Sequence, residues 1–434
     1  MTLVTRLVGV DDPIFERWLT TVGAVFKDRP SQDAEAMAAR RPRMVGDRIR
    51  AVTAPADPLR QPGGDLDEVV ACFLSWDGDL TVPGGTARVD LISAVTVLPT
   101  HRRQGALSKL MHEDLGQAKA DGTCAAVLIA SEGGIYGRFG FGPATGAASY
   151  RVDARRARLR PELAGPPPSG RTAVVPVASL REVAPQVYQR ARRAGAVDRD
   201  RFWWDHMCCV EVFPGSDRKP PFAVVHRDGS GEVDGYLWYR PKEEHGVGHR
   251  RRTTFGTVTV EDLQATTDEA YRDLWGYLLA LDLVDEVLWD DAALDEPLAW
   301  LLSDPRALRL TTRDDFLWAR LLDPAAALGA RRYESGAGQV VLQVDDPFGW
   351  AAGVYTLTVS HDGGGRAVPT PDAQVQARLD VDVLSGLWLG GDALAGGLVG
   401  AALAGRARDL QPGALARLAL LLRTHRQPLC TTWF

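Results

Sequence analysis

The sequence predicts a mixed α/β (α+β) fold distributed over three domains. First, its 434 residues are enough for two or three domains. Second, strand-like apolar runs alternate with amphipathic helical patterns along the chain. Third, the stretch 165–170 is rich in proline and glycine, so it cannot continue a helix and marks a surface connection. We expect domains over residues 1–152, 153–309 and 310–434.

In the first domain, residues 12–26 are expected to form a helix with one apolar face. That face carries Phe15, Trp18, Leu19, Val22 and Phe26. Strand-like patterns follow at 69–73 and 91–97, with a glycine-containing turn at 83–85 between them. Helices and strands therefore alternate around one sheet.

The most informative segment is a strand, a basic turn and a helix in direct succession. Val95, Thr96 and Val97 end the strand, and the loop Arg102, Arg103, Gln104, Gly105 and Ala106 leads into a helix with an apolar stripe. The first N–H groups of a helix have no partner within it and attract anions. The arginines add positive charge, and a glycine lets a ligand approach the backbone. The loop indicates a phosphate site, with a solvated basic turn as the simpler alternative; it is neither a Walker A motif nor a dinucleotide fingerprint.

A second unusual segment lies downstream. Residues 125–130 form a short apolar run, which predicts a buried strand. Residues 131–143 contain too many glycines for a helix interior and are expected to form a tight turn from which Tyr136 projects.

Together these segments resemble one protein family. The basic loop is similar to the pyrophosphate loop of GNAT acetyltransferases, and 99–103 combined with 131–140 resemble the Eis (enhanced intracellular survival) branch of GNAT N-acetyltransferases. The resemblance implies a GNAT domain, a second GNAT-like domain without a cofactor loop, and a third domain similar to sterol carrier proteins. It also implies that the pyrophosphate of acetyl-CoA lies over Arg102–Ala106. The pantetheine would then pair with Val95–Val97, and Ser131 would contact the donor.

The second and third domains carry weaker patterns. In the second, strands are expected at 172–177, 223–226 and 235–239, and helices at 183–194 and 267–283. The aromatic run 202–204 is interpreted as a packing cluster. In the third, strands are expected at 340–344 and 355–359, a helix at 412–422, an amphipathic element at 393–404, and a helix over 317–328 interrupted at Pro324.

The resemblance also implies catalytic roles. Tyr136 would be the general acid, since a phenol with a pKa near 10 stays protonated at pH 7; the alternative is a hydroxyl that caps the turn backbone. The α-carboxylate of Phe434 would be the general base, inserted into the active site; the alternative is a hydrophobic plug with no proton role. Asp28 and Trp433 would contact the substrate, although an acidic residue is expected at the position of Trp433, and Asp28 could equally be an exposed turn residue.

The expected function is acetyl transfer from acetyl-CoA to amines of aminoglycosides, polyamines or lysine side chains. The alternative is a non-catalytic acyl-CoA-binding regulatory protein, or one that binds lipids or proteins. The net charge of −6 argues against nucleic acid binding. Five cysteines without a C-x-x-C pair argue against a disulfide framework or zinc site, and the histidines show no ligand spacing, so we expect no metal. No signal peptide or membrane-length apolar run is evident, which predicts a cytoplasmic protein. The resemblance implies a homo-oligomer, a hexamer.

Overall fold

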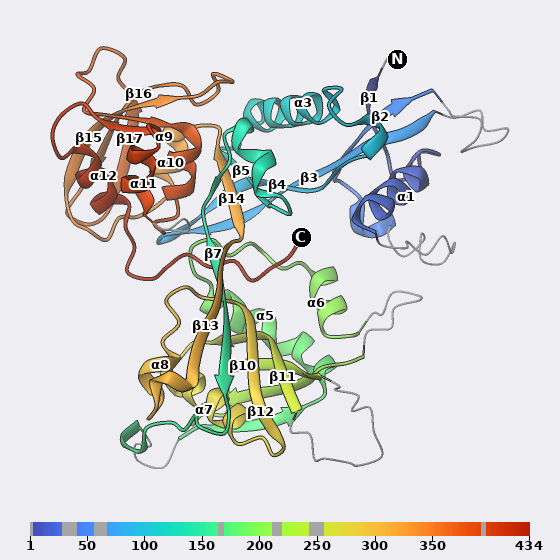
Figure 1. The fold of residues 1–434 in the computed structure, drawn as a ribbon, viewed down its shortest axis with the longest axis vertical. Helices are drawn as coiled ribbons and strands as arrows, with labels where there is room; N and C mark the ends of the chain where they lie inside the picture. The colour runs from blue at the N-terminus through green and yellow to red at the C-terminus, as the bar shows by residue number, and fades with distance from the viewer. Residues whose placement is uncertain are drawn as a thin grey trace.

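The computed structural model describes residues 3–27, 41–55, 67–163, 169–210, 219–242, 256–391 and 396–434. These residues form sheets of seven, seven and five strands, each with helices packed against it. Figure 1 shows the first sheet at the top, the second below it and the third at the side. The prediction of a mixed α/β fold is confirmed.

The first sheet is covered by one long helix on each face. Its strands lie in the order β1 (Val4–Leu7), β2 (Arg48–Ala54), β3 (Glu68–Val82), β4 (Gly85–Val97), β5 (Ala125–Ile129), β14 (Leu317–Leu321) and β6 (Gly142–Pro143). Helix α1 (Phe15–Phe26) buries Phe15 and Trp18 against β2 and β3. Helix α3 (Ala106–Ala120) buries Leu110 and Leu115 against the opposite face, which also includes residues of β5.

The second sheet repeats this layered arrangement. Its order is β13 (Leu308–Asp315), β7 (Gly146–Asp153), β12 (Val284–Ala292), β11 (Gly256–Ala265), β10 (Val233–Lys242), β9 (Phe222–Arg227) and β8 (Arg171–Val175). Helices α5 (Leu180–Ala191) and α6 (Arg201–Met207) cover one face, and α7 (Asp268–Leu279) covers the other. A short helix, α8 (Leu298–Leu301), follows β12.

The first two domains exchange strands. The chain leaves the first sheet through β7, which joins the second, and returns through β13 to β14, which pairs with β5 and β6. The predicted helix over 317–328 is therefore wrong in its first half: residues 317–321 are a strand buried on both faces, and such a short apolar run carries no helical or strand period. Pro324 does not interrupt a helix but begins α9 (Pro324–Gly329), because the Asp323 side chain caps it by accepting from the Ala326 N–H at 3.0 Å.

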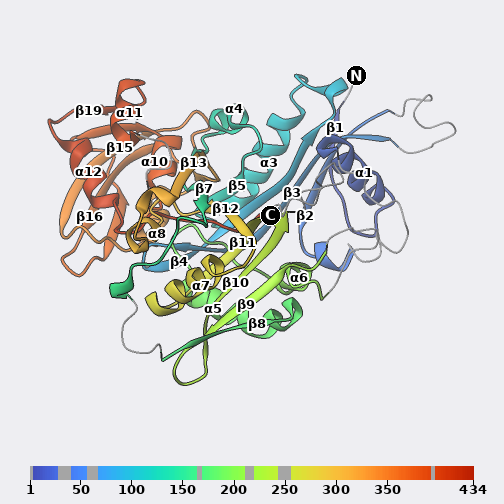
Figure 2. The ribbon, with the colours of Figure 1, turned by 60° about the horizontal axis from the view of Figure 1, so that its bottom comes forward.

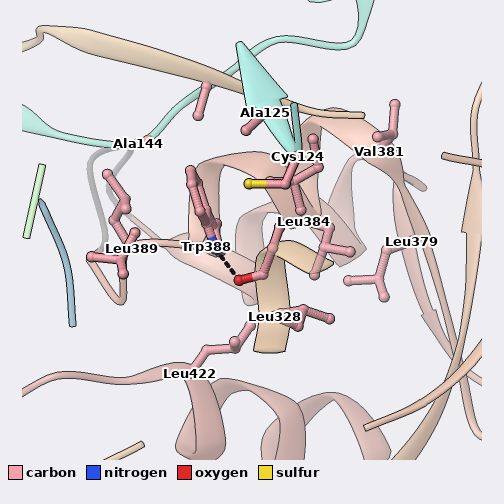
Figure 3. Close-up of a cluster of buried hydrophobic side chains, with 14 of the residues drawn as sticks. Cys124, Ala125, Ala144, Leu328, Leu379, Val381, Leu384, Trp388, Leu389 and Leu422 are labelled. Atoms are coloured by element: carbon pink, nitrogen blue, oxygen red, sulfur yellow. Dashed lines mark hydrogen bonds between the residues drawn. The ribbon is translucent and has the colours of Figure 1, made fainter. Parts of the chain in front are cut away.

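The third domain packs one of its helices directly against strands of the first sheet. Its sheet has the order β17 (Gly365–Pro369), β16 (Gly353–Val359), β15 (Gly338–Asp345), β18 (Ala377–Asp380) and β19 (Ala407–Asp409), with helices α10 (Val381–Leu387), α11 (Gly397–Leu403) and α12 (Ala414–Leu422). Figure 3 shows Trp388 at the centre of one apolar cluster that also includes Cys124 and Ala125 of the first domain. The indole of Trp388 donates to the Ala327 carbonyl at 2.8 Å. This shared core fixes the third domain against the first.

The remaining short elements are one-turn helices at chain reversals. They are η1 (Arg41–Met44), η2 (Pro99–His101), α4 (Gly133–Tyr136), η3 (Gly137–Phe139), η4 (Pro161–Leu163), η5 (Val177–Ser179) and η6 (Pro305–Ala307). Within the described part of the chain, no helix is both long enough and apolar enough to cross a membrane.

Candidate active site

Strands β4 and β5 run parallel but separate near the middle of the first sheet. Their pairing covers Asp90–Ile92 against Ala126–Leu128. Beyond Ile92, β4 continues to pair with β3 on its other side, so among the described residues the edge of Val95–Val97 that faces β5 has no strand partner. A free strand edge accepts an extended amide chain through main-chain hydrogen bonds.

The basic loop lies at the end of this edge. The four residues from Arg102 to Gly105 are exposed, and Arg103 and Gly105 adopt left-handed backbone angles of φ 63° and 83°. Gly105 is the N-cap of α3 and supplies no capping side chain, so the first N–H groups of the helix remain available to a ligand. A Cβ added at Gly105 would meet no atom within 4 Å. Open space, free donors and two arginines together suit a phosphate group.

A buried polar cluster supports the opening between β4 and β5. Asp90 and Asp114 are both fully buried; Arg48 pairs with Asp90, and the Nε of Arg50 lies 3.1 Å from a carboxylate oxygen of Asp114. Ser75 donates to the same Asp114 oxygen at 2.7 Å. Burial, and then the neighbouring Asp114 charge, raise the pKa of Asp90 well above its ordinary value. The cluster ties β2, β3, β4 and α3 together beside the opening, and the sequence patterns did not single it out.

Tyr136 ends the single helical turn α4, just after β5. Residues 131–143 are expected to form a tight turn, and the structure places two single helical turns there, α4 and η3. The side chain is 7% exposed and its ring meets Phe141 edge-on at 6.2 Å. Among the described residues, its hydroxyl has no hydrogen-bond partner. Burial, followed by the charge of Glu132, raises the pKa of Tyr136 to about 12. The phenol therefore stays protonated at neutral pH and can act as a proton donor. Ser131 is exposed between β5 and α4.

The C-terminal tail reaches the same region from the other side. In both ribbon views the C-terminus lies between the first sheet and the second (Figures 1 and 2). The half-buried Phe434 ring meets Trp76 of β3 edge-on at 5.7 Å. Trp433 is 59% exposed; its ring packs on Phe316 at 4.8 Å and its indole N–H donates to Asp291 at 2.9 Å. Burial raises the pKa of Asp291.

Tyr136 and Phe434 approach the sheet from opposite faces. Residues alternate between the two faces of a strand. In β5, Ala126 and Leu128 belong to the same core cluster as Tyr136, whereas Val127 belongs to the cluster against which Phe434 packs. Tyr136 and Phe434 therefore lie on opposite faces of the sheet that contains this opening. Asp28 is outside the described residues.

The second domain has two parallel strands in the same arrangement, but the helix that follows the first of them offers no phosphate site. Strands β11 and β12 are parallel, are joined by α7, and pair only up to Val260 and Trp289. The N-terminus of α7 is closed by the Thr267 side chain, which accepts from the Ala270 N–H at 3.1 Å, and Asp268 and Glu269 add negative charge there. Both features disfavour a phosphate group.

Sequence patterns missed several polar residues of the second domain. Arg199, Asp262 and Asp291 contact the C-terminal tail or the residues that hold it, although Arg199 lies in a run of alternating charges that is typical of a solvated surface. The structure also brings His226, Glu269 and Asp273 within 4.8 Å of one another, which spacing could not reveal. Hydrogen bonds account for that group, because His226 bonds to Asp234 at 2.6 Å and to Asp273 at 3.2 Å.

Comparison with protein families places three domains along the chain. Residues 10–144 and 195–321 each match a model described as an acetyltransferase (GNAT) domain. Residues 324–431 match a model described as a sterol carrier protein domain. The predicted succession of GNAT, GNAT-like and sterol-carrier-like folds is confirmed.

Individual relatives extend over most of the chain. An uncharacterized N-acetyltransferase of Streptomyces avermitilis is 42% identical over 385 residues, covering 87% of this chain and 89% of the relative. N-acetyltransferase Eis of Mycobacterium tuberculosis is 36% identical over 346 residues, covering 76% of this chain and 78% of the relative. Among solved structures, Eis1 from Mycobacterium abscessus superposes with a TM-score of 0.81 at 31% identity, covering both chains completely.

Proposed function

This chain belongs to the Eis family of GNAT N-acetyltransferases, and from that premise we propose that it acetylates amines of aminoglycosides, polyamines or lysine side chains with acetyl-CoA as the donor. It is an acyltransferase of a fold that uses acyl-CoA. The observation that carries the proposal is the opening between β4 and β5, in a sheet with the Tyr136 phenol on one face and the C-terminal Phe434 on the other.

The donor is proposed to bind along the free edge of β4. Arg102–Ala106 and the N-terminus of α3 hold the pyrophosphate, and Val95–Val97 pair with the pantetheine amides. Ser131 contacts the donor at the end of β5. The thioester then lies in the opening between β4 and β5, close to Tyr136.

The two catalytic groups have opposite roles in proton transfer: Phe434 accepts a proton and Tyr136 donates one. The α-carboxylate of Phe434, directly or through water, takes a proton from the acceptor ammonium, which is almost entirely charged at neutral pH. The freed amine nitrogen attacks the thioester carbonyl and forms a C–N bond. The C–S bond then breaks, and Tyr136 donates its proton to the departing thiolate of CoA. The nitrogen gives up its second proton as the amide forms, and this proton restores the Tyr136 phenol, directly or through water. Burial and the charge of Glu132 keep Tyr136 protonated for this step.

The region that binds the acceptor amine is proposed to favour positively charged substrates. Trp433 offers an exposed aromatic face, Asp291 lies beside it, and Asp28 is the further proposed contact. We place the enzyme in the cytoplasm as a homo-hexamer, by analogy with its family. Family membership disfavours a purely regulatory or lipid-binding role.

A screen of amines tests the proposal. The purified chain is incubated with acetyl-CoA and a panel of aminoglycosides, linear polyamines and lysine peptides, and the release of CoA thiol is followed. The proposal predicts saturable, amine-dependent thiol release and an acetylated product of the expected mass. Thiol release that no amine in the panel accelerates would contradict it.

A further inference from the structure

The last residues of the tail lie along the second domain rather than the third, to which they are covalently attached. The Leu429 N–H donates to the Ala194 carbonyl at 2.8 Å, and the Gln427 N–H donates to Asp295 at 3.1 Å. Cys430 and Thr432 are almost completely buried. The position of Phe434 therefore depends on the contacts that residues of the second domain make with the tail.

One arginine of the second domain makes three hydrogen bonds to the tail. The Nε of Arg199 donates to the Thr432 hydroxyl at 2.9 Å. One of its terminal nitrogens donates to the Thr431 hydroxyl at 2.9 Å and to the Thr431 carbonyl at 3.2 Å. These two threonines are the third and second residues before Phe434, with only Trp433 between Thr432 and the proposed base.

The guanidinium of Arg199 is itself held rigidly. Its side chain is 1% exposed, and its other terminal nitrogen lies 2.6 Å from Asp262 of β11. The rings of Tyr188 and Trp203 both lie 4.0 Å from it. An ion pair that is hydrogen-bonded and stacked in this way leaves the guanidinium few alternative positions. The Tyr188 hydroxyl, at 3.2 Å, adds a further contact to Thr432.

These contacts occur where strands β11 and β12 separate. A cavity of about 300 Å³ lies there, lined by residues 261–265 of β11 and 289–291 of β12, and by Leu429 and Thr431 of the tail. In the first domain, the corresponding separation of β4 and β5 is the proposed donor site. In the second domain, where the N-terminus of α7 disfavours a phosphate group, the C-terminal tail binds in this region instead.

We infer that Arg199 is a positioning residue for the α-carboxylate of Phe434, and that the second GNAT-like domain serves the reaction by holding the base contributed by the third. The inference rests on the proposed role of that carboxylate. Arg199 acts through Thr431 and Thr432 and touches no reacting atom.

The test removes one hydrogen-bond acceptor of the tail, the Thr432 hydroxyl, and leaves Arg199 paired with Asp262. Thr432→Val keeps the side-chain shape but loses both hydroxyl contacts, so kcat is expected to fall about 10- to 100-fold at pH 7, since a displacement of roughly 1 Å can cost about 10² in rate. The Kd of acetyl-CoA should stay within about twofold. Thr432→Ser restores the hydroxyl and should restore most of kcat. Thr356→Val is the matched control, because it removes a threonine–threonine hydrogen bond in the third sheet and should leave kcat unchanged.

The pH dependence separates positioning from simple loss of structure. Because the base is needed only while the acceptor amine is protonated, the deficit of Thr432→Val should shrink as the pH approaches the amine pKa of about 10. A deficit that is constant with pH, or a kcat equal to that of the parent, would overturn the inference. Thr431→Val removes a different contact to Arg199 and provides the same test if Thr432→Val does not fold.

A double variant distinguishes this inference from the proposed function. With one alanine added after Phe434, Thr432→Val should cause no further loss, because the base is already displaced. If the extension abolishes turnover while Thr432→Val alone matches the parent, only the role of Arg199 is wrong. If the extended protein keeps full turnover, the carboxylate is not the base, and both claims fail together.

Discussion

Replacement of Gly105 isolates the electrostatic part of donor binding. The structure provides a matched pair, Gly105→Asp and Gly105→Asn, because a Cβ at this position meets nothing within 4 Å. The backbone angle of φ 83° is one that asparagine and aspartate tolerate better than other residues do. The pair has nearly the same size and differs in one negative charge.

The expected stability change is small. A side chain at this left-handed position costs about 1 kcal/mol. Because a Cβ at Gly105 meets nothing within 4 Å, we expect the free energy of unfolding to change by no more than about 1 kcal/mol in either variant.

The expected binding change is large for aspartate only. Two unit charges about 5 Å apart repel by about 1 kcal/mol in a water-like dielectric and by about 3 kcal/mol at an effective dielectric of 20. Two phosphate charges therefore cost at least about 2 kcal/mol, which is roughly a 30-fold loss of affinity or more. Isothermal titration with acetyl-CoA measures this difference, which should narrow at high salt. If the two folded variants bind acetyl-CoA with equal affinity, or both bind it as tightly as the parent does, the assignment of the loop as the pyrophosphate site is refuted.

Three further predictions concern the acid, the pH dependence of stability and the assembly. Tyr136→Phe should fold normally and bind acetyl-CoA, but kcat should fall about 10²–10⁴-fold; a kcat within a few-fold of the parent, with chemistry rate-limiting, would remove Tyr136 from the acid role. Burial raises the pKa of Glu296 from 4.5 to about 7, so the folded state loses stability as the pH rises from about 5 to 8. Thermal melts of Glu296→Gln should lack this loss, which amounts to at most about 3 kcal/mol, and an unchanged pH dependence would contradict the explanation. Light scattering should report a hexamer, and a monomer at micromolar concentrations would contradict the assembly.

Local sequence patterns predicted the first domain well. The helix over 12–26 corresponds to α1, and residues 69–73, 91–97 and 125–130 correspond to parts of β3, β4 and β5. These elements have a clear apolar period or clear turn residues at their ends. Strong local signals of this kind need no information from the rest of the chain.

Long-range arrangement could not be predicted in the same way. The run 317–321 pairs with β5, almost two hundred residues earlier, and nothing in its own composition distinguishes this from a helix. Arg199 could not be singled out from the sequence, because Asp262, with which it pairs, and the threonines that it contacts lie far from it along the chain. Sequence motifs pointed to the loop and to Tyr136, whereas no motif indicated which residues hold the C-terminal tail.

The role of the terminal carboxylate is the central claim, and one extension tests it most directly. Adding a single alanine after Phe434 moves the carboxylate by about 3.3–3.6 Å, the length of one extended residue. A displacement of roughly 1 Å can already cost about 10² in rate. We predict that kcat at pH 7 falls at least about 100-fold in the extended protein, while its Kd for acetyl-CoA and its melting temperature match the parent. Full turnover by the extended protein would show that the carboxylate of Phe434 is not the base.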